Sequence, residues 1–310
     1  MKPVLAGMVY GLFQGAQLLI MKAVGLSADP LVLSFSFLVV ANLTLTAWIS
    51  AAGHWPKIAA GWRRWPYWLI VGIFNSTLTY LTVAGVHLSG ASLAGVLVRS
   101  DLIFGVLLGY LIFREEVRGG EISGGMMMLA GILCVTDISI KDLAHISIGH
   151  LYLLLAGLLL AVNALIIKYG LGMLWQPAVA WFNTATASVC LGLVLLLNGA
   201  WPGLSELAAP LALLGVLALG AKESLGLLAY YYALASFPAW IARSFSLLAP
   251  LVAIGGGWLI FGEIMTTRQI AGTILAISGM IVLHYFRSRR LFSAGGQFTK
   301  ETTRNFLPSR

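Results

Sequence analysis

The chain has 310 residues, of which 59% are hydrophobic and only 10% are charged, and its formal net charge is +8. A soluble domain carries about a quarter charged residues, so this inventory cannot cover a water-facing surface. The basic residues are spread over the tail and the segments between apolar runs, which is typical of membrane topology. We therefore expect a polytopic membrane protein that binds no nucleic acid.

Ten apolar runs are long enough to cross a bilayer, which takes about 20 residues per helix. Short connections that contain prolines separate the runs, such as Asp29-Pro30 and Phe237-Pro238. In chain order the predicted spans cover residues 3–21, 30–52, 66–87, 91–113, 120–138, 149–168, 176–198, 210–235, 238–261 and 268–286. The sequence thus predicts an all-α integral membrane protein with ten transmembrane helices.

The basic residues also predict the orientation of these spans, because cytoplasmic loops carry an excess of lysine and arginine. With the N-terminus in the cytoplasm, the cytoplasmic segments hold Lys2, Lys57, Arg63, Arg64, Arg114, Arg118, Lys168, Arg287, Arg289 and Arg290. The opposite side then holds Lys22, Lys141 and Arg268. We expect a multi-pass protein of the cell (inner) membrane with both termini in the cytoplasm and a disordered tail at residues 287–310.

One motif occurs twice in the chain. The run Leu-Ile-Phe-Arg-Glu at residues 111–115 returns as Leu-Ile-Phe-Gly-Glu at residues 259–263, an offset of 148 that holds along spans three to five and eight to ten. Five spans per half is an odd number, so the second half must enter the membrane upside down. The sequence predicts two inverted five-helix repeats, residues 1–138 and 149–286, joined by a linker at residues 139–148.

The two repeated glutamates, Glu115 and Glu263, lie at span ends beside loops. We expect each of them to cap the helix that follows, or to pair with Arg118 or Arg268. They are therefore predicted to support the fold rather than to contact a substrate.

This pattern resembles the drug/metabolite transporter superfamily and its EamA family. The residues that carry the resemblance are the two runs ending in Phe-x-Glu, the stretch Tyr230–Leu234 and the pair Ala249-Pro250 in span nine. The resemblance implies a secondary transporter that exports small metabolites. In the family, span four tends to carry a proline where span nine has Pro250, whereas this chain has Leu102 there, just after Arg99-Ser100-Asp101.

Ionised residues lie in the middle of two predicted spans, Arg99 and Asp101 in span four and Lys222 and Glu223 in span eight. Each costs roughly 2.5–3.5 kcal/mol to insert at a helix centre, so a partner, water or a ligand must offset the cost. One interpretation is structural pairing between helices, in which Asp101 meets Lys222 and Arg99 meets Glu223. The other is a polar substrate cavity where the two repeats meet.

Positions 99 and 101 are about 200° apart around a regular helix. We therefore expect one of these two residues to contact substrate while the other pairs laterally. Arg243, near the end of span nine, either reaches the cytoplasmic interface or faces substrate, on one helical stripe with Ser236, Ser246 and Pro250.

Polar stripes on other spans extend the candidate site. Asn75, the repeat mate of Glu223, begins a stripe on span three, and Gln14 lies in a stripe on span one between Tyr10 and Gln17. Tyr230 and its aromatic neighbours either stack on a ligand or anchor the membrane interface; they are Tyr231, Tyr232 and Trp240. The complete set of substrate-binding candidates is Arg99, Asp101, Glu223, Lys222, Arg243, Asn75, Gln14 and Tyr230.

The buried charges favour a class of substrate. Three basic residues against two acidic ones leave one excess positive charge within the spans, which suits a carboxylate-bearing or zwitterionic solute such as an amino acid. A buried carboxylate exchanges protons near neutral pH, so Glu223 or Asp101 is a candidate carrier of a coupling proton.

We predict a transporter rather than an enzyme, because the sequence has no nucleophile or metal-ligand motif, and we expect no cofactor and no metal site. Its predicted partners are a small-molecule substrate, the lipid bilayer and a coupling proton, and a homodimer is left open. The expected mechanism is alternating access with efflux. The alternative is a flippase for lipid-linked sugar or head-group cargo.

Overall fold

A computed structural model describes residues 3–25, 28–59, 61–113, 119–135, 147–237, 242–243 and 245–293. Within these ranges the chain forms helices joined by short turns and has no strand. Seven helical segments are long and apolar enough to cross a membrane, and three shorter apolar helices accompany them. These ten segments coincide with the ten predicted spans, which confirms the all-α membrane fold.

The helices of the first half are α1 (Pro3–Gly25), α2 (Pro30–Ala51), α3 (Trp55–Ala59), η1 (Trp62–Arg64), α4 (Trp65–Ser89), α5 (Ala91–Leu97), η2 (Val98–Ser100), α6 (Asp101–Phe113) and α7 (Gly119–Val135). The helices of the second half are α8 (Ile148–Leu171), α9 (Gln176–Leu197), η4 (Trp201–Ala208), α10 (Pro210–Ser236), η5 (Phe245–Leu247), α12 (Leu248–Phe261) and α13 (Thr267–Ser293). Spans four and nine were expected as single regular helices, and that expectation is wrong, because the 3₁₀ turns η2 and η5 interrupt them.

The start of α2 shows how local chemistry sets a boundary. Pro30 occupies the first turn, where its missing N–H costs nothing. The side chain of Asp29 accepts hydrogen bonds from the backbone N–H groups of Leu31, at 2.8 Å, and Val32, at 3.3 Å. An N-cap of this kind satisfies donors that would otherwise be orphaned at the helix end. α9 and α10 also begin with a proline in their first turn.

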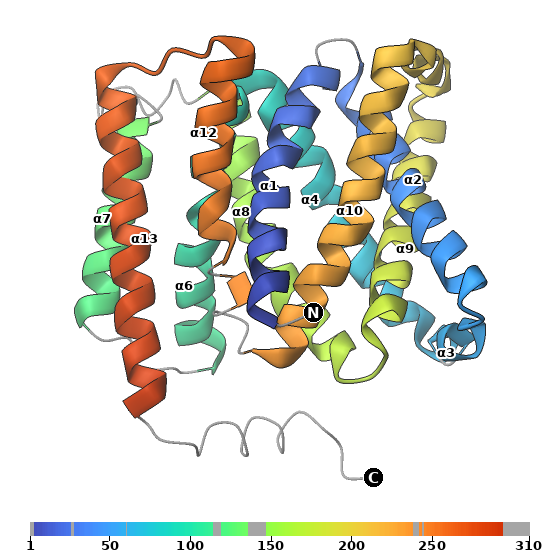
Figure 1. Ribbon diagram of the computed structural model, residues 1–310, viewed down its shortest axis with the longest axis horizontal. Helices are drawn as coiled ribbons and strands as arrows, with labels where there is room; N and C mark the ends of the chain where they lie inside the picture. Colours follow the sequence, from blue (N-terminus) through green and yellow to red (C-terminus); the bar gives the residue numbers. More distant parts are fainter. Residues whose placement is uncertain are drawn as a thin grey trace.

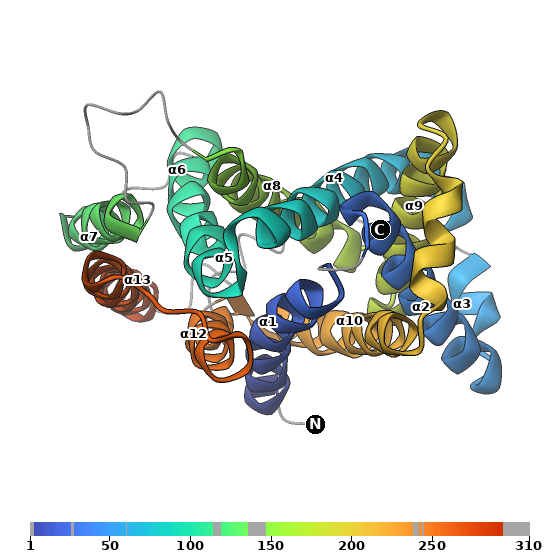
Figure 2. The same cartoon turned by 90° about the horizontal axis from the view of Figure 1, so that it is seen from above.

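Helix contacts occur in matched pairs that relate the two halves. α1 packs against α10, and its counterpart α8 packs against α4. In the same way α10 packs against α2 and α4 against α9, while α1 meets α12 and α8 meets α6. Counterparts also pack on each other, α7 on α13 at one end of the molecule and α2 on α9 at the other (Figure 2). This is the contact pattern of a pseudo-two-fold axis.

The first helices of the two halves run in opposite directions. α1 and α4 end at the same face of the molecule. Lys22, in the last turn of α1, and the backbone of Ala91, just after α4, both bind the carboxylate of Glu263. α8 begins at this same face, since Gly149 packs against Leu88 and Ser89 at the end of α4. α1 begins and α13 ends toward the other face (Figure 1). The described helices are thus arranged as the inverted repeat requires.

Candidate functional site

Both broken spans are interrupted at corresponding places. η2 covers Val98–Ser100 in span four and η5 covers Phe245–Leu247 in span nine, and the offset of 148 residues aligns the two turns to within one residue. Pro250 follows η5 whereas Leu102 follows η2, so span four breaks without a proline. A stretch of 3₁₀ helix inside a longer helix often marks a functional hinge, and the substrate sites of many transporters lie where corresponding helices of two inverted repeats meet.

A glycine on the neighbouring helix lets each break pack closely. A Cβ atom added to Gly157 of α8 would collide with the side chain of Ser100 and lie 3.1 Å from the backbone nitrogen of Asp101. A Cβ atom added to Gly11 of α1 would collide with the carbonyl oxygen of Phe245. The register that pairs Lys22 with Lys168 also pairs these two glycines. The first helix of each half therefore packs against the 3₁₀ turn of the other half: α8 against η2, and α1 against η5.

An ion pair joins the two broken spans. Asp101, the first residue of α6, is 1% exposed, and its Oδ2 atom pairs with Nη2 of Arg243. Arg243 is 8% exposed, and its Nη1 atom donates to the carbonyl oxygen of Leu160 on α8 at 2.9 Å. Arg243 therefore does not reach the interface, and Asp101 does not meet Lys222 as the structural interpretation expected.

Arg99 lies in η2 and is 2% exposed. Its Nε and Nη1 atoms have no hydrogen-bond partner among the described residues, and neither has Oδ1 of Asp101. Buried polar atoms without a partner are rare, so these atoms form a cluster that can still bind something. Arg99, Asp101 and Arg243 all act electrostatically on Tyr10, which places the cluster beside α1.

Two tyrosines pack together beside these charges. The rings of Tyr10 on α1 and Tyr230 on α10 are stacked, with their centroids 4.5 Å apart. Both are buried, and the hydroxyl of the adjacent Tyr231 accepts a hydrogen bond from Asn183 at 2.7 Å. Tyr230 and Tyr231 are thus core residues, whereas an interface anchor would be exposed. Trp240 lies outside the described residues.

Lys222 and Glu223 form a second cluster, two helical turns from Tyr230 on α10. The Nζ atom of Lys222 donates to Oε2 of Glu223 at 2.9 Å and to Oε1 of Gln17 on α1. Glu223 therefore does not pair with Arg99, the other structural pair expected. The predicted site includes Gln14 of the polar stripe on α1, but the side chain of that stripe that reaches Lys222 is Gln17.

The model of a family described as "EamA-like transporter family" matches residues 1–137 and 147–285. The chain belongs to this family. It is a multi-pass membrane transporter of small molecules, and the family and its relatives point away from an enzyme.

Two curated relatives of this EamA-like transporter are similar along most of their length. A "Probable amino-acid metabolite efflux pump" of Salmonella typhimurium is 24% identical over 66% of this chain and 72% of its own. An "Uncharacterized transporter" of Archaeoglobus fulgidus is 25% identical over 72% of this chain and 78% of its own. A solved crystal structure covers 94% of the transporter and 98% of its own chain with a TM-score of 0.66, and at 17% identity it shows a shared fold.

Two sequence expectations for the transporter's site differ from the structure. One is the stripe through Ser236, Arg243 and Pro250, which is not one helical face, because α10 ends at Ser236 and η5 intervenes. The angle of about 200° between residues 99 and 101 also does not apply, because it assumes a regular α-helix and η2 is a 3₁₀ turn. Asn75 is buried and Gln14 half-buried, and their predicted contact with substrate stays a prediction.

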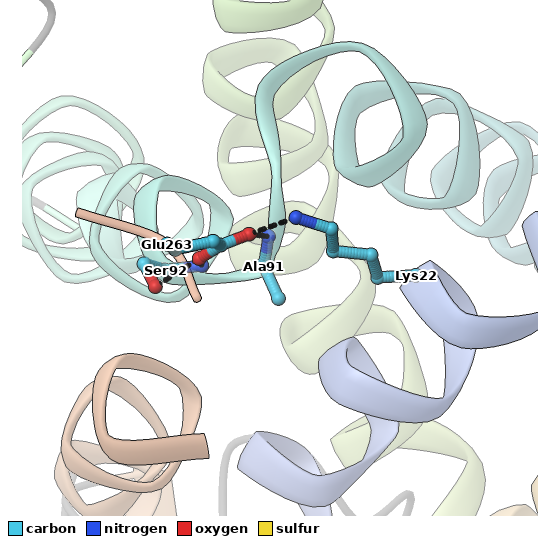
Figure 3. A network of polar contacts seen from close by, with 4 residues as sticks. All are labelled: Lys22, Ala91, Ser92 and Glu263. Atoms are coloured by element: carbon cyan, nitrogen blue, oxygen red, sulfur yellow. Dashed lines mark hydrogen bonds and ion pairs between the residues drawn. The ribbon is translucent and has the colours of Figure 1, made fainter. Parts of the chain in front are cut away.

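The glutamate that ends the second repeat motif has a different role from the one expected. Glu263 caps α5, a helix of the other half, rather than the helix that follows it (Figure 3). It also pairs with Lys22 at the end of α1. Its repeat mate Glu115 lies outside the described residues.

Proposed function

We propose that this transporter exports small carboxylate-bearing metabolites, amino acids among them, by alternating access. The observation that carries the proposal is the buried guanidinium of Arg99 at the break of span four, with two N–H donors unpartnered among the described residues. A charged N–H donor of a guanidinium forms a short, strong hydrogen bond with a carboxylate oxygen. The substrate's carboxylate would thus complete the hydrogen bonding of Arg99.

The charge balance of the buried groups supports an anionic substrate group. Within the two clusters, Asp101 neutralises Arg243 and Glu223 neutralises Lys222, which leaves Arg99 without a carboxylate partner there. An uncompensated buried charge costs several kcal/mol, so a carboxylate bound to Arg99 would offset that cost. A simple cation such as a quaternary amine would be repelled by the same residue.

The aromatic pair supports a substrate with an apolar part. The ring of Tyr10 lies on α1, which packs against η5 and α12, and the stacked ring of Tyr230 lies on α10, which packs against α1. They offer a flat apolar surface within the electrostatic reach of Arg99. The name of the Salmonella typhimurium relative supports amino-acid metabolites as the substrates and efflux as the direction.

The two halves supply the movement in this proposal. Substrate would bind at the two breaks, and rocking of one inverted repeat against the other would expose that site to either side in turn. We place the start of α1 and the end of α13 in the cytoplasm. The described basic residues that lie toward that face support this orientation in the inner membrane, as cytoplasmic loops are rich in lysine and arginine; they are Lys57, Arg63, Arg64 and Lys168.

Proton coupling would act through Glu223 in this proposal. Its carboxylate is held by Lys222, which also bridges to Gln17 on α1, so protonation of Glu223 would loosen the contact between α10 and α1. A protonophore should then abolish uphill accumulation by the wild type. A Glu223→Gln variant should show no uphill accumulation, and the protonophore should not change its downhill flux. Accumulation that survives the protonophore in the wild type contradicts the coupling.

Transport by purified protein in liposomes tests the function. Amino acids, other carboxylates and quaternary amines are offered in counterflow, and we expect saturable flux of carboxylate-bearing solutes only. Arg99→Met should lower the apparent affinity about 10- to 100-fold, the worth of one or two charge-assisted hydrogen bonds. Lys57→Met, on the exposed end of α3, is the matched control. Full flux in the Arg99 variant, or transport of quaternary amines or lipid-linked sugars instead, would overturn the proposal.

A further inference from the structure

Every described hydrogen bond to the carboxylate of Glu263 comes from a residue of the other half. Its Oε1 atom accepts hydrogen bonds from Nζ of Lys22 and, at 3.1 Å, from the backbone N–H of Ala91. Its Oε2 atom accepts from the backbone N–H of Ser92, at 3.0 Å, and from the Ser92 hydroxyl. Figure 3 shows Lys22 reaching from α1 toward this carboxylate. We call these four residues the Glu263 network.

Two glycines make room for the carboxylate. A Cβ atom on Gly90 would lie 2.7 Å from Oε1 of Glu263, and Gly90 has a φ of 85°, which side chains rarely adopt. A Cβ atom on Gly257 of α12 would collide with Oε2 of Glu263 and with the hydroxyl of Ser92. A larger residue at either position would displace the carboxylate, so the local sequence on both sides of the seam suits this contact.

The network is partly shielded from water and needs an ionised carboxylate. The side chains of Lys22 and Glu263 are 20% and 16% exposed. Burial alone would raise the pKa of Glu263, which lies in the loop after α12, but hydrogen bonds from Lys22 and Ser92 outweigh it and lower that pKa. Partial burial also weakens the screening that makes exposed ion pairs worth little.

The Glu263 network lies above a direct contact between the two broken spans. Below it α5 packs against α12, and a Cβ atom on Gly95 would lie 2.8 Å from Cβ of Ala253. α5 leads directly into η2, the turn that holds Arg99. Opening a path from this face to the site must therefore separate α5 from α12 and break the hydrogen bonds of Glu263.

We propose that the Glu263 network is the gate of this face: Glu263 positions α5 against the second half, and its bonds break and re-form in each transport cycle. This inference rests on the proposed alternating access. The opposite face of the molecule has different contacts. Lys168, the repeat mate of Lys22, donates to the carbonyl oxygens of Leu234, at 3.2 Å, and Phe237, at 3.1 Å, so its described bonds stay within the second half.

Spin-label distances across this face test the gate. Labels on Leu88→Cys, at the end of α4, and Ile264→Cys, next to Glu263, lie on exposed positions of opposite halves, 51% and 89% exposed. Cys134 and Cys190 are first replaced by serine. We expect the wild type to favour the short distance and Glu263→Gln to raise the ratio of long to short distances about tenfold, because a charge-assisted network is lost.

Two further variants keep this test sharp. Lys22→Met removes the ion pair but leaves the cap on α5, so it should shift the distances in the same direction by a smaller factor. Lys168→Met is the matched control, the same change at the same helix end, and it should not lengthen the distance. Unchanged distances in both Glu263→Gln and Lys22→Met, or equal lengthening in Lys168→Met, would overturn the gate.

The outcome can be separated from that of the proposed function, because the distances are measured in lipid nanodiscs without substrate. If the distances shift as expected but the wild type carries no carboxylate-bearing solute, the substrate proposal fails and the gate stands. If the wild type carries such solutes but the distances do not respond to the variants, the gate fails and the proposed function stands.

Discussion

Among the described residues, the ion pairs of Asp101 with Arg243 and of Lys22 with Glu263 join the two halves of this transporter, and they differ in how completely they are hydrogen-bonded. At the broken helices, Asp101 uses one oxygen for Arg243, and its other oxygen and two donors of Arg99 have no partner among the described residues. At the face, Glu263 uses both oxygens and accepts four hydrogen bonds. A fully bonded polar network fixes one arrangement, whereas an incompletely bonded one leaves groups that a ligand can satisfy. This difference distinguishes the proposed binding site at Arg99 from the proposed gate at Glu263.

The largest expected effect comes from breaking the buried pair. Asp101→Asn leaves Arg243 as an uncompensated buried charge, which should cost about 3–5 kcal/mol in the free energy of unfolding. Thermal or denaturant unfolding of the protein in detergent measures this. The double variant Asp101→Asn with Arg243→Met should regain most of the stability because no charge is then left unpaired. Equal stability of the single variant and the wild type would show that the pair does not hold the broken spans together.

Arg99 should behave in the opposite way. Since its guanidinium has unpartnered buried donors, Arg99→Met should leave the free energy of unfolding unchanged or raise it, while the affinity for carboxylate substrates falls about 10- to 100-fold. The same unfolding assay and the counterflow assay give the two numbers. A variant that loses stability by as much as Asp101→Asn would make Arg99 a structural residue, and the contrast between binding site and closure would disappear.

The helices of both regions could be predicted from sequence, but the partners of their charged side chains could not. Apolar length alone predicts the ten spans, and the repeat predicts how they pair. The break at Arg99 could not be predicted, because no proline or glycine lies within η2 and the close contact comes from Gly157 on another helix. Lys222 and Glu223 pair with each other although neighbouring residues do not share a helical face. Which charges meet depends on lateral packing, which a pattern along one helix does not contain.

At the Glu263 network, the backbone offers a smaller test. Gly90→Ala should cost about 1–2 kcal/mol in stability, because alanine is strained at a φ of 85° and its Cβ would press on the carboxylate. The spin-label distance across the face should lengthen in the same variant. Gly53→Ala is the control for alanine at a positive φ away from the network, since Gly53 lies in the turn after α2 and has a φ of 65° with open space around it. Lengthening in both variants would show that the effect is not specific to the Glu263 network.

The smallest effect is expected from pH. Since hydrogen bonds from Lys22 and Ser92 lower the pKa of Glu263 below its ordinary value of 4.5, the network favours the ionised form. Its stabilising contribution is present above pH 4.5 and is lost as the pH falls through the lowered pKa, when the carboxylate takes up a proton. The long distance should therefore become more populated only below about pH 4.5, and Glu263→Gln should show no such change. A wild type that opens near neutral pH would mean that another group controls the face, because Lys22 is the one charged residue that the described contacts place against Glu263.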